Sequence, residues 1–178
     1  MKKILIIGAN GQIGSELIAA LRKKYGGANV AGLDLREPGE EQKGAGPWEI
    51  GDATKKEDIE AALDKHKIDS VFHLAALLSA TGEKDPDLCW RLNMDSLRHV
   101  LELAKARKLS VFWPSSIAAF GPTTPRVKTP QLTALEPTTM YGVTKVAGEL
   151  LCQYYHHRWN VDVRSVRYAA STSRTTGN

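Results

Sequence analysis

Cysteine is scarce in this sequence, which has only two, Cys89 and Cys152, among 178 residues. Neither belongs to a group of Cys, His, Asp or Glu residues with the spacing of a metal site, so we predict no bound metal. Two buried thiols without partners are typical of a reducing compartment, which favours a cytoplasmic location.

Long hydrophobic runs are also missing. Residues 4–7 follow Met1-Lys2-Lys3 as the apolar part of a signal peptide would, but the run is too short and Gly8 interrupts it. No stretch approaches the length of a membrane span. A cluster of positive charge is missing as well: the 24 Lys and Arg residues are scattered among 20 Asp and Glu residues. The sequence therefore predicts neither a membrane nor a nucleic acid as partner.

Glycine, in contrast, recurs every third residue at positions 8, 11 and 14, between a predicted strand at 4–7 and a helical pattern at 16–21. Three glycines with these flanks suit a dinucleotide: they permit a sharp turn, close approach of a pyrophosphate, and tight packing of helix on strand. The helix N-terminus offers amides and a positive dipole end to the phosphates. A purely structural glycine turn is the alternative. The predicted phosphate-binding residues are Gly8, Gly11, Gln12, Ile13 and Gly14.

Two acidic residues follow predicted strands and extend this nucleotide site. Asp34 ends the strand at 30–34, about 20 residues after Gly14, where an acid accepts hydrogen bonds from the adenosine ribose and favours NAD over NADP. Arg36 leaves the choice of cofactor open. Asp52, next to Ala53, stands at the end of a short strand where adenine could reach it, although a turn acid near a helix start has the same spacing.

The remaining segments alternate between strand and helix patterns, which predicts a doubly wound parallel α/β sheet (Rossmann fold) in the order 3-2-1-4-5-6, covered on both faces. A capping box of Thr54 and Glu57 opens one helix. His73 is predicted to be a packed or backbone-bonded histidine rather than a base. We expect strands at 4–7, 30–34, 48–50, 69–76, 110–116 and 161–168; helices at 16–21, 54–67, 87–107 and 140–159; and loops at 36–47, 77–83 and 117–139.

The last predicted helix combines a chemical pair with an apolar stripe. Tyr141 and Lys145 lie four residues apart and so share a face, where an ammonium would lower the pKa of the phenol and suit it to proton abstraction. Ser116, at the end of a strand, could bond the substrate oxygen beside Tyr141. The small residues after His73 would leave room for a ligand. The predicted packing stripe consists of Val143, Val146, Ala147, Leu150, Leu151 and Tyr154.

Together these residues resemble the extended type of the short-chain dehydrogenase/reductase superfamily, marked by Gly-x-x-Gly-x-x-Gly, an active-site Ser or Thr, and Tyr-x-x-x-Lys. The resemblance implies NAD as cofactor, a catalytic triad of Ser116, Tyr141 and Lys145, and a structural role for Asn93. It also implies that helices near 93–107 and 141–158 pair across a homodimer. The residues that it assigns to the ribose, the adenine and the strand beside the cofactor are Asp34, Asp52, Ala53, Leu74, Ala75 and Ala76.

A narrower resemblance is to the L-threonine 3-dehydrogenases, through residues 73–80, 114–123 and 140–145. It implies NAD-dependent oxidation of the threonine 3-hydroxyl to 2-amino-3-oxobutyrate. In that reaction Tyr141 is the base and contacts both substrate and cofactor. Lys145 holds the nicotinamide ribose, and Ser116 contacts the substrate hydroxyl. Ser79 is then a candidate substrate contact.

The end of the chain departs from these relatives, which continue with a Pro-Gly turn and a smaller substrate domain. Here Tyr168 is followed by Ala169-Ala170. We therefore expect an NAD-binding domain at 1–168, a polar tail at 169–178, and a C-terminal truncation that leaves the substrate domain largely missing. Two other functions stay open: a nucleotide-sugar epimerase or reductase of the same superfamily, and a non-catalytic NAD-binding module.

Overall fold

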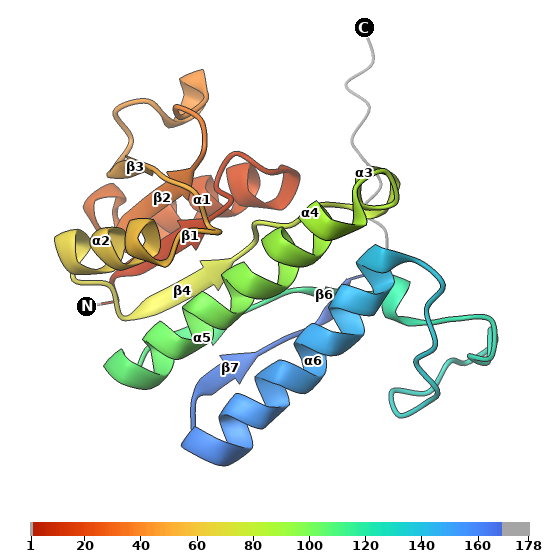
Figure 1. Ribbon diagram of the computed structural model, residues 1–178. Coiled ribbons are helices and arrows are strands. Elements are labelled where there is room, and N and C mark those ends of the chain that lie inside the picture. Colours follow the sequence, from red (N-terminus) through yellow and green to blue (C-terminus); the bar gives the residue numbers. More distant parts are fainter. Residues whose placement is uncertain (1, 169–178) are drawn as a thin grey trace, which may run out of the picture.

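The computed structural model describes residues 2–168, which form a six-stranded parallel sheet with helices on both sides (Figure 1). The sheet order is β3-β2-β1-β4-β5-β7. This confirms the predicted order, since β7 is the sixth strand of that sheet. Its strands are β1 (Ile4–Ile7), β2 (Val30–Asp34), β3 (Trp48–Ile50), β4 (Ser70–His73), β5 (Ser110–Phe112) and β7 (Asp162–Arg164). The polar tail predicted at 169–178 lies outside the described residues.

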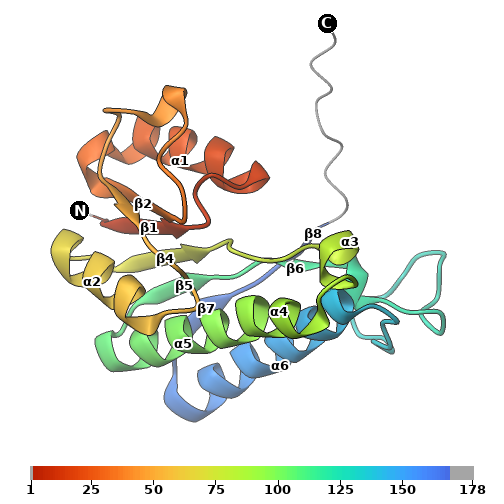
Figure 2. The ribbon, with the colours of Figure 1, turned by 45° about the horizontal axis from the view of Figure 1, so that its top comes forward.

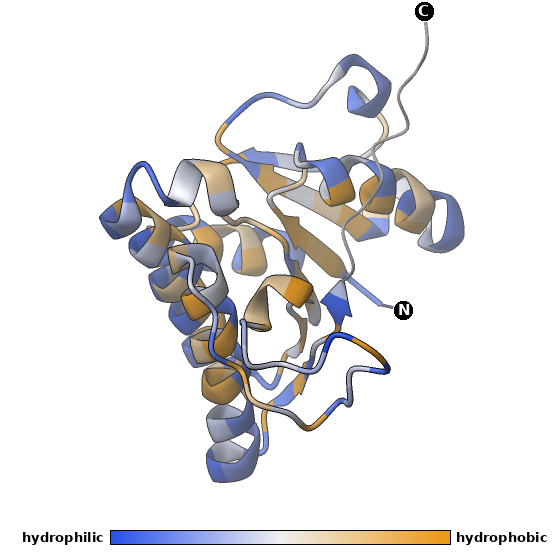
Figure 3. Ribbon diagram, turned by 90° about the vertical axis from the view of Figure 1, so that its right-hand side faces the viewer, coloured by the Kyte–Doolittle hydropathy of each residue, from blue (hydrophilic) through white to orange (hydrophobic). Residues whose placement is uncertain are grey.

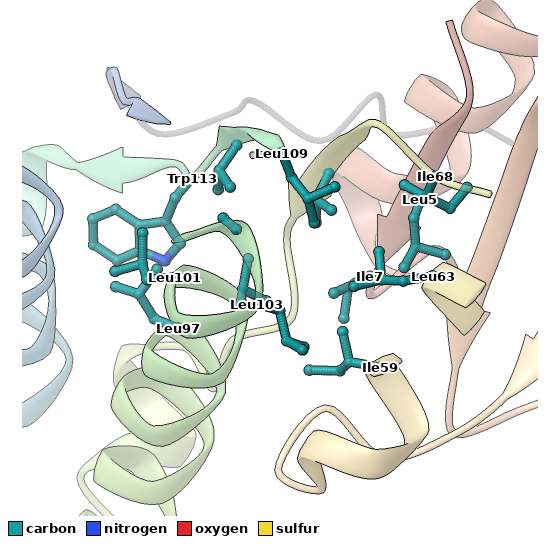
Figure 4. Packing of buried hydrophobic residues seen from close by; sticks show 14 of the residues in the cluster. Leu5, Ile7, Ile59, Leu63, Ile68, Leu97, Leu101, Leu103, Leu109 and Trp113 are labelled. Atoms are coloured by element: carbon teal, nitrogen blue, oxygen red, sulfur yellow. The ribbon is translucent and has the colours of Figure 1, made fainter. Parts of the chain in front are cut away.

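Alternate residues of β1 face two separate cores, as expected for a strand buried on both sides. Leu5 and Ile7 belong to the larger core, shared with the helices in front of the sheet in Figure 1 and shown closely in Figure 4. Ile4 and Ile6 belong to the smaller core, with Ile18 of α1. The principal helices are α1 (Gln12–Tyr25), α2 (Lys56–His66), α5 (Ser96–Arg107) and α6 (Met140–Trp159).

The two faces of the sheet are covered unevenly. Figure 2 shows α2, α5 and α6 below the sheet and α1 above β1 and β2. On the α1 side, over β4, β5 and β7, a groove of about 240 Å³ is lined by residues that include the half-buried Phe72 and Phe112. Their ring centroids lie 5.5 Å apart. Leu21 and Tyr25 of α1 line another part of the same groove.

The strand predicted at 110–116 is divided at Pro114, which has no N–H to donate. Only the short β6 (Ser115–Ser116) follows, paired with β8 (Arg167–Tyr168) in a separate two-stranded sheet. Hydrogen bonds from Trp113 N to Arg164 O and from Ser115 N to Val166 O, 3.0 and 2.9 Å long, continue the pairing across the break. The strand predicted at 161–168 is interrupted correspondingly.

The capping box predicted at Thr54 is wrong. Helix α2 begins at Lys56, and no side chain caps it within the described chain. Thr54 is instead drawn into a local turn, because its N–H and its hydroxyl both donate to Asp52 Oδ1, at 2.9 and 2.8 Å. The Thr54 hydroxyl is therefore directed to Asp52, and Lys55 takes the N-cap position of α2.

Three further predicted segments differ in detail. The loop at 77–83 contains one helical turn, α3 (Ser79–Gly82). The helix predicted at 87–107 consists of α4 (Pro86–Trp90), a π-helical turn (Arg91–Asp95) and α5. The loop at 36–47 is not wholly surface, since Gln42 is buried and its side-chain oxygen accepts from Arg22 at 3.0 Å. The segment at 117–139 has only a short 3₁₀ turn, Ile117–Ala119.

Helix α6 turns a different face to the sheet from the one that its apolar pattern predicts. Its buried residues are Tyr141, Gly142, Thr144, Lys145, Gly148, Cys152 and Tyr155. Gly148 fits here because a Cβ would lie 2.3 Å from the Trp113 ring. From the predicted stripe, Val143, Leu150 and Tyr154 are exposed instead. Figure 3, coloured by hydropathy, shows apolar colour on strands of the sheet and also on outer turns of helices.

Candidate functional site

Each of the three glycines in the turn suits its position for a different structural reason. Gly8 has φ +81°, and a Cβ there would lie 2.6 Å from Ala75 N. A Cβ on Gly14 would lie 2.2 Å from Gly8 O, so this glycine allows α1 to approach the turn. A Cβ on Gly11 would meet only Gly8 O, at 3.2 Å, and would otherwise project into open space. Gly11 therefore marks the face of the turn that is left free for a ligand.

The start of α1 fits an anionic group. Gly11 is its N-cap, and no side chain of the described residues caps this end. Gln12, Ile13 and Gly14 form the first turn, whose backbone amides have no earlier carbonyl of the helix to bond. No acidic residue lies in that turn. Free amides, the helix dipole and the open face at Gly11 together match what a pyrophosphate requires.

A cavity of about 190 Å³ adjoins this turn at the carboxyl ends of β1, β2, β3 and β4. Ligands of open α/β sheets bind at this edge. The cavity brings together most of the predicted nucleotide residues, whereas Gln12, Ile13, Gly14, Tyr141 and Lys145 are not in its lining. The predicted residues that line it are Gly8, Gly11, Asp34, Asp52, Ala53, Leu74, Ala75 and Ala76.

Asp34 is held in place by backbone amides. Its Oδ2 accepts from Asn10 N at 2.9 Å and its Oδ1 from Arg36 N at 3.3 Å. An ionised carboxylate has about four acceptor positions, so capacity remains for a ribose hydroxyl. The Asn10 side chain also donates to Glu37 O at 2.9 Å, which attaches the glycine turn to the segment after β2. The Arg36 side chain is exposed, with its Nε 3.9 Å from Asp34 Oδ1.

Asp52 is a turn acid whose position also borders the cavity beside the glycine turn. Its side chain accepts from Thr54, which makes it a turn acid, and its own N–H donates to Asp58 Oδ2 at 2.8 Å. Asp52 also lines this cavity together with Ala53. The turn therefore fixes the segment that forms this wall of the cavity.

His73 is a packed histidine and not a base. Its side chain is fully buried, and its Nε2 lies 2.8 Å from Ser96 Oγ. Burial, with a smaller contribution from Lys145, lowers the pKa of His73 to about 3. The imidazole is therefore neutral at physiological pH, and its partner is a side chain rather than the backbone.

Ser116 and Tyr141 meet where β6 ends and α6 begins. The neighbouring Ser116 side chain acts to lower the pKa of the Tyr141 phenol. Burial acts in the opposite direction and is larger, so the pKa of Tyr141 is raised above its ordinary value. The Ser116 hydroxyl also accepts from Ala118 N at 3.1 Å, which fixes the position of its oxygen. A hydroxyl and a phenol are thus held together at one end of the sheet.

Lys145 lies one helical turn after Tyr141 but is directed elsewhere. Its Nζ donates to Pro114 O at 2.7 Å and lies 4.5 Å from the Trp113 ring centroid and 5.3 Å from that of Tyr141. The prediction that its ammonium lowers the pKa of Tyr141 is therefore wrong for this arrangement, in which burial dominates. Burial also lowers the pKa of Lys145, to about 8.

Asn93 connects α6 to the segment after β4. Its Oδ1 accepts from Leu77 N at 2.7 Å, and its Nδ2 donates to Leu77 O at 3.1 Å and to Thr144 Oγ1 at 3.0 Å. Thr144 in turn donates to Tyr141 O at 2.7 Å. The side chain of Asn93 thus has a structural role. Thr144 was missed from sequence, although it directly precedes Lys145 in the Tyr-x-x-x-Lys motif.

Ser79 lies at the exposed start of α3. The other end of this helix approaches α6, since a Cβ on Gly82 would lie 4.0 Å from Tyr141 Cβ. Within residues 2–168, no group of three or more His, Cys, Asp or Glu residues could hold a metal ion. The described helices also include none that is long and apolar enough to cross a membrane.

Comparison with known proteins agrees with this geometry. The model of the NAD dependent epimerase/dehydratase family matches residues 4–177, and the chain belongs to this family. An uncharacterized epimerase/dehydratase of Staphylococcus saprophyticus is 54% identical over 171 residues, which cover 94% of this chain and 53% of that protein. The chain thus spans about half the length of the curated relatives that it matches.

Two solved structures share the fold closely. The L-threonine dehydrogenase of Clostridium difficile is 50% identical, with a TM-score of 0.91 over 94% of this chain and 53% of that one. The holo form of the GalE-like L-threonine dehydrogenase of Cupriavidus necator is 54% identical, with a TM-score of 0.90 over 93% of this chain and 54% of that one.

Proposed function

We propose that this chain carries the NAD-binding and proton-transfer parts of an L-threonine 3-dehydrogenase, which oxidises the threonine 3-hydroxyl to 2-amino-3-oxobutyrate. The observation that carries the proposal is the proximity of Ser116 to the Tyr141 phenol, with Lys145 Nζ 5.3 Å from the Tyr141 ring centroid. Support also comes from the similarity to the solved L-threonine dehydrogenases, at 50% and 54% identity.

The nucleotide residues divide by chemistry. The amides around Gly11, Gln12, Ile13 and Gly14 would hold the pyrophosphate, and Asp34 would accept from the adenosine ribose. Because the Asp34 carboxylate would repel a 2′-phosphate, we propose NAD rather than NADP. The adenine and the adjacent part of the cofactor would be enclosed by the cavity residues Asp52, Ala53, Leu74, Ala75 and Ala76.

The reaction needs a proton acceptor and a group that orients the substrate alcohol. Tyr141 would take the hydroxyl proton as its phenolate, and Ser116 would donate to the same oxygen and hold it in place. Ser79 and Ser116 would contact the substrate. Bound NAD supplies the hydride acceptor. Lys145 is within one helical turn of Tyr141, and turning its ammonium from Pro114 O toward the nicotinamide ribose would also stabilise the phenolate.

Two measurements test this proposal. One is NADH formation from L-threonine, and the other is NAD binding measured by calorimetry. We expect NAD to bind, and Tyr141→Phe to bind it equally while losing turnover by about 10² to 10⁴. Activity on a UDP-sugar and none on threonine would favour the epimerase or reductase function. Undetectable and equal turnover in both proteins, with NAD still bound, would favour a non-catalytic module. Loss of NAD binding in the unaltered chain would end the proposal.

We also infer self-association through the outer face of α6. Val143, Leu150 and Tyr154 are spaced to lie on one side of the helix, and Leu150 and Tyr154 are 60% and 53% exposed. An apolar stripe of this kind on a helix surface is typical of a protein interface. We propose that it pairs with the same stripe of a second copy, as the implied homodimer requires.

A further inference from the structure

A hydrogen bond joins the end of α3 to the start of α6. Glu83 Oε1 accepts from Met140 N at 2.6 Å. Met140 is the first residue of α6, so its N–H has no carbonyl partner within the helix. A carboxylate at this position both satisfies that amide and interacts favourably with the positive end of the helix dipole. Tyr141 is the next residue along the chain.

The other side of Glu83 is connected to the backbone of Ser79. Glu83 N donates to Ser79 O at 3.0 Å, and Gly82 N donates to Leu78 O at 2.7 Å. Gly82 leaves no space for a larger residue, because a Cβ there would lie 2.8 Å from Cys89 Sγ. The helical turn that carries Ser79 is therefore seated closely against α4, and Glu83 extends from it to α6.

We propose that Glu83 is a positioning residue that fixes Ser79 relative to Tyr141. The connection runs from the Ser79 carbonyl to the Glu83 amide, and from the Glu83 carboxylate to the amide of Met140. This inference rests on the proposed function for the roles of Ser79 and Tyr141. Glu83 itself does not touch the reacting atoms. It acts by holding the two elements that carry them at one separation.

The start of α6 has other support, which makes the role of Glu83 separable from folding. The Thr139 hydroxyl caps the helix by accepting from Gly142 N at 3.0 Å. Asn93 and Thr144 hold the next turn. Without the Glu83 carboxylate we therefore expect α6 to form, but α3 to lose its direct attachment to Met140. A misplacement of about 1 Å between reacting groups can reduce turnover by as much as 10².

The experiment compares Glu83→Ala with Glu83→Gln in the full chain, with Glu41→Ala as the control at an exposed acid. Gln retains an oxygen that can accept from Met140 N, whereas Ala does not. We expect Glu83→Ala to shift the Met140 amide NMR signal and to lower kcat with L-threonine by roughly tenfold to a hundredfold. The Kd for NAD should stay unchanged. Glu83→Gln should restore most of the turnover, and Glu41→Ala should behave as the unaltered chain.

Two outcomes would overturn the inference. One is a Met140 amide signal in Glu83→Ala identical to that of the unaltered chain. The other is equal turnover in Glu83→Ala and Glu83→Gln. If the unaltered chain binds NAD but does not oxidise threonine, the proposed activity of this chain fails, and the positioning role of Glu83 is decided separately. The Met140 amide signal and a titration of the Tyr141 phenol then still decide whether Glu83 positions the start of α6, because neither measurement needs turnover.

Discussion

Lys145 donates a hydrogen bond of 2.7 Å to the carbonyl of Pro114, which is the residue that divides β5 from β6. The side chain is buried, with 3% of the residue exposed. It thereby connects the helix that carries Tyr141 to the strand end that carries Ser116. The same burial disfavours the charged form of Lys145, and the effect can be measured as a pH dependence of the free energy of unfolding.

The contribution of Lys145 to stability should depend on pH above neutrality. Burial lowers its pKa from 10.5 to about 8, so between these values the unfolded chain binds more protons than the native one. Stability from this group therefore rises with pH across that window. Relative to Lys145→Met, the unaltered chain should gain on the order of 3 kcal/mol between pH 8 and 10.5. Urea unfolding of both proteins at several pH values measures the difference, and parallel curves would contradict it.

Alanine substitutions at Gly11 and Gly14 should affect different properties, namely NAD binding and the stability of the fold. Gly14→Ala places a Cβ 2.2 Å from Gly8 O, so we expect it to lose roughly 2 kcal/mol or more of stability. Gly11→Ala meets Gly8 O at 3.2 Å and should change stability by less than about 1 kcal/mol. Its methyl group would nevertheless occupy the open face and raise the Kd for NAD at least about tenfold. Calorimetry and thermal unfolding of both variants test this, and unchanged NAD binding by Gly11→Ala would refute it.

Asn93→Ala should destabilise the fold. The change removes bonds of 2.7 and 3.1 Å to the Leu77 backbone and one of 3.0 Å to Thr144. Loss of buried hydrogen bonds of this kind costs about 2 to 4 kcal/mol when partners stay unsatisfied. Gln153→Ala, at an exposed amide of α6, should stay within about 0.5 kcal/mol of the unaltered chain. Equal urea midpoints for the two variants would show that Asn93 has no structural role.

Self-association should depend on the exposed face of α6. Leu150→Lys places a charge in the apolar stripe and should shift the protein toward monomer, with the dissociation constant rising roughly tenfold or more. Leu132→Lys is the matched control, because Leu132 is 93% exposed in the loop at 117–139 and lies outside the stripe. Sedimentation velocity over a range of concentrations measures both. A monomeric unaltered chain, or an effect of equal size in the control, would contradict the proposed interface.

The parts of the fold that could be predicted from sequence are those set by local pattern. The alternation of Ile4, Leu5, Ile6 and Ile7 between two cores follows from a strand buried on both faces, and the sheet order follows from its connections. The glycine turn could be predicted because strand, turn and helix are consecutive. The close approach of Gly8 to Ala75 depends on the segment that follows β4, which the local sequence pattern does not place.

The parts that could not be predicted depend on competition between distant groups. Thr54 has the sequence of a cap, but its hydroxyl is directed to Asp52 in a local turn, and Lys55 is the N-cap of α2. The stripe on α6 was assigned to packing because apolar residues usually face the core, whereas this helix buries Lys145 and Thr144. The direction of the Lys145 ammonium depends on Pro114 O, which lies 31 residues earlier and has no sequence motif of its own.

The groove beside Phe72 and Phe112 has a consequence for how this chain behaves in a test tube. Water contacts one side of an aromatic pair that the sheet places over β4 and β5. A net charge of +4 spread over the surface offers little repulsion against contact between two such faces. We therefore expect an apolar fluorescent dye to bind the folded chain at this face, and self-contact through it to limit the usable protein concentration.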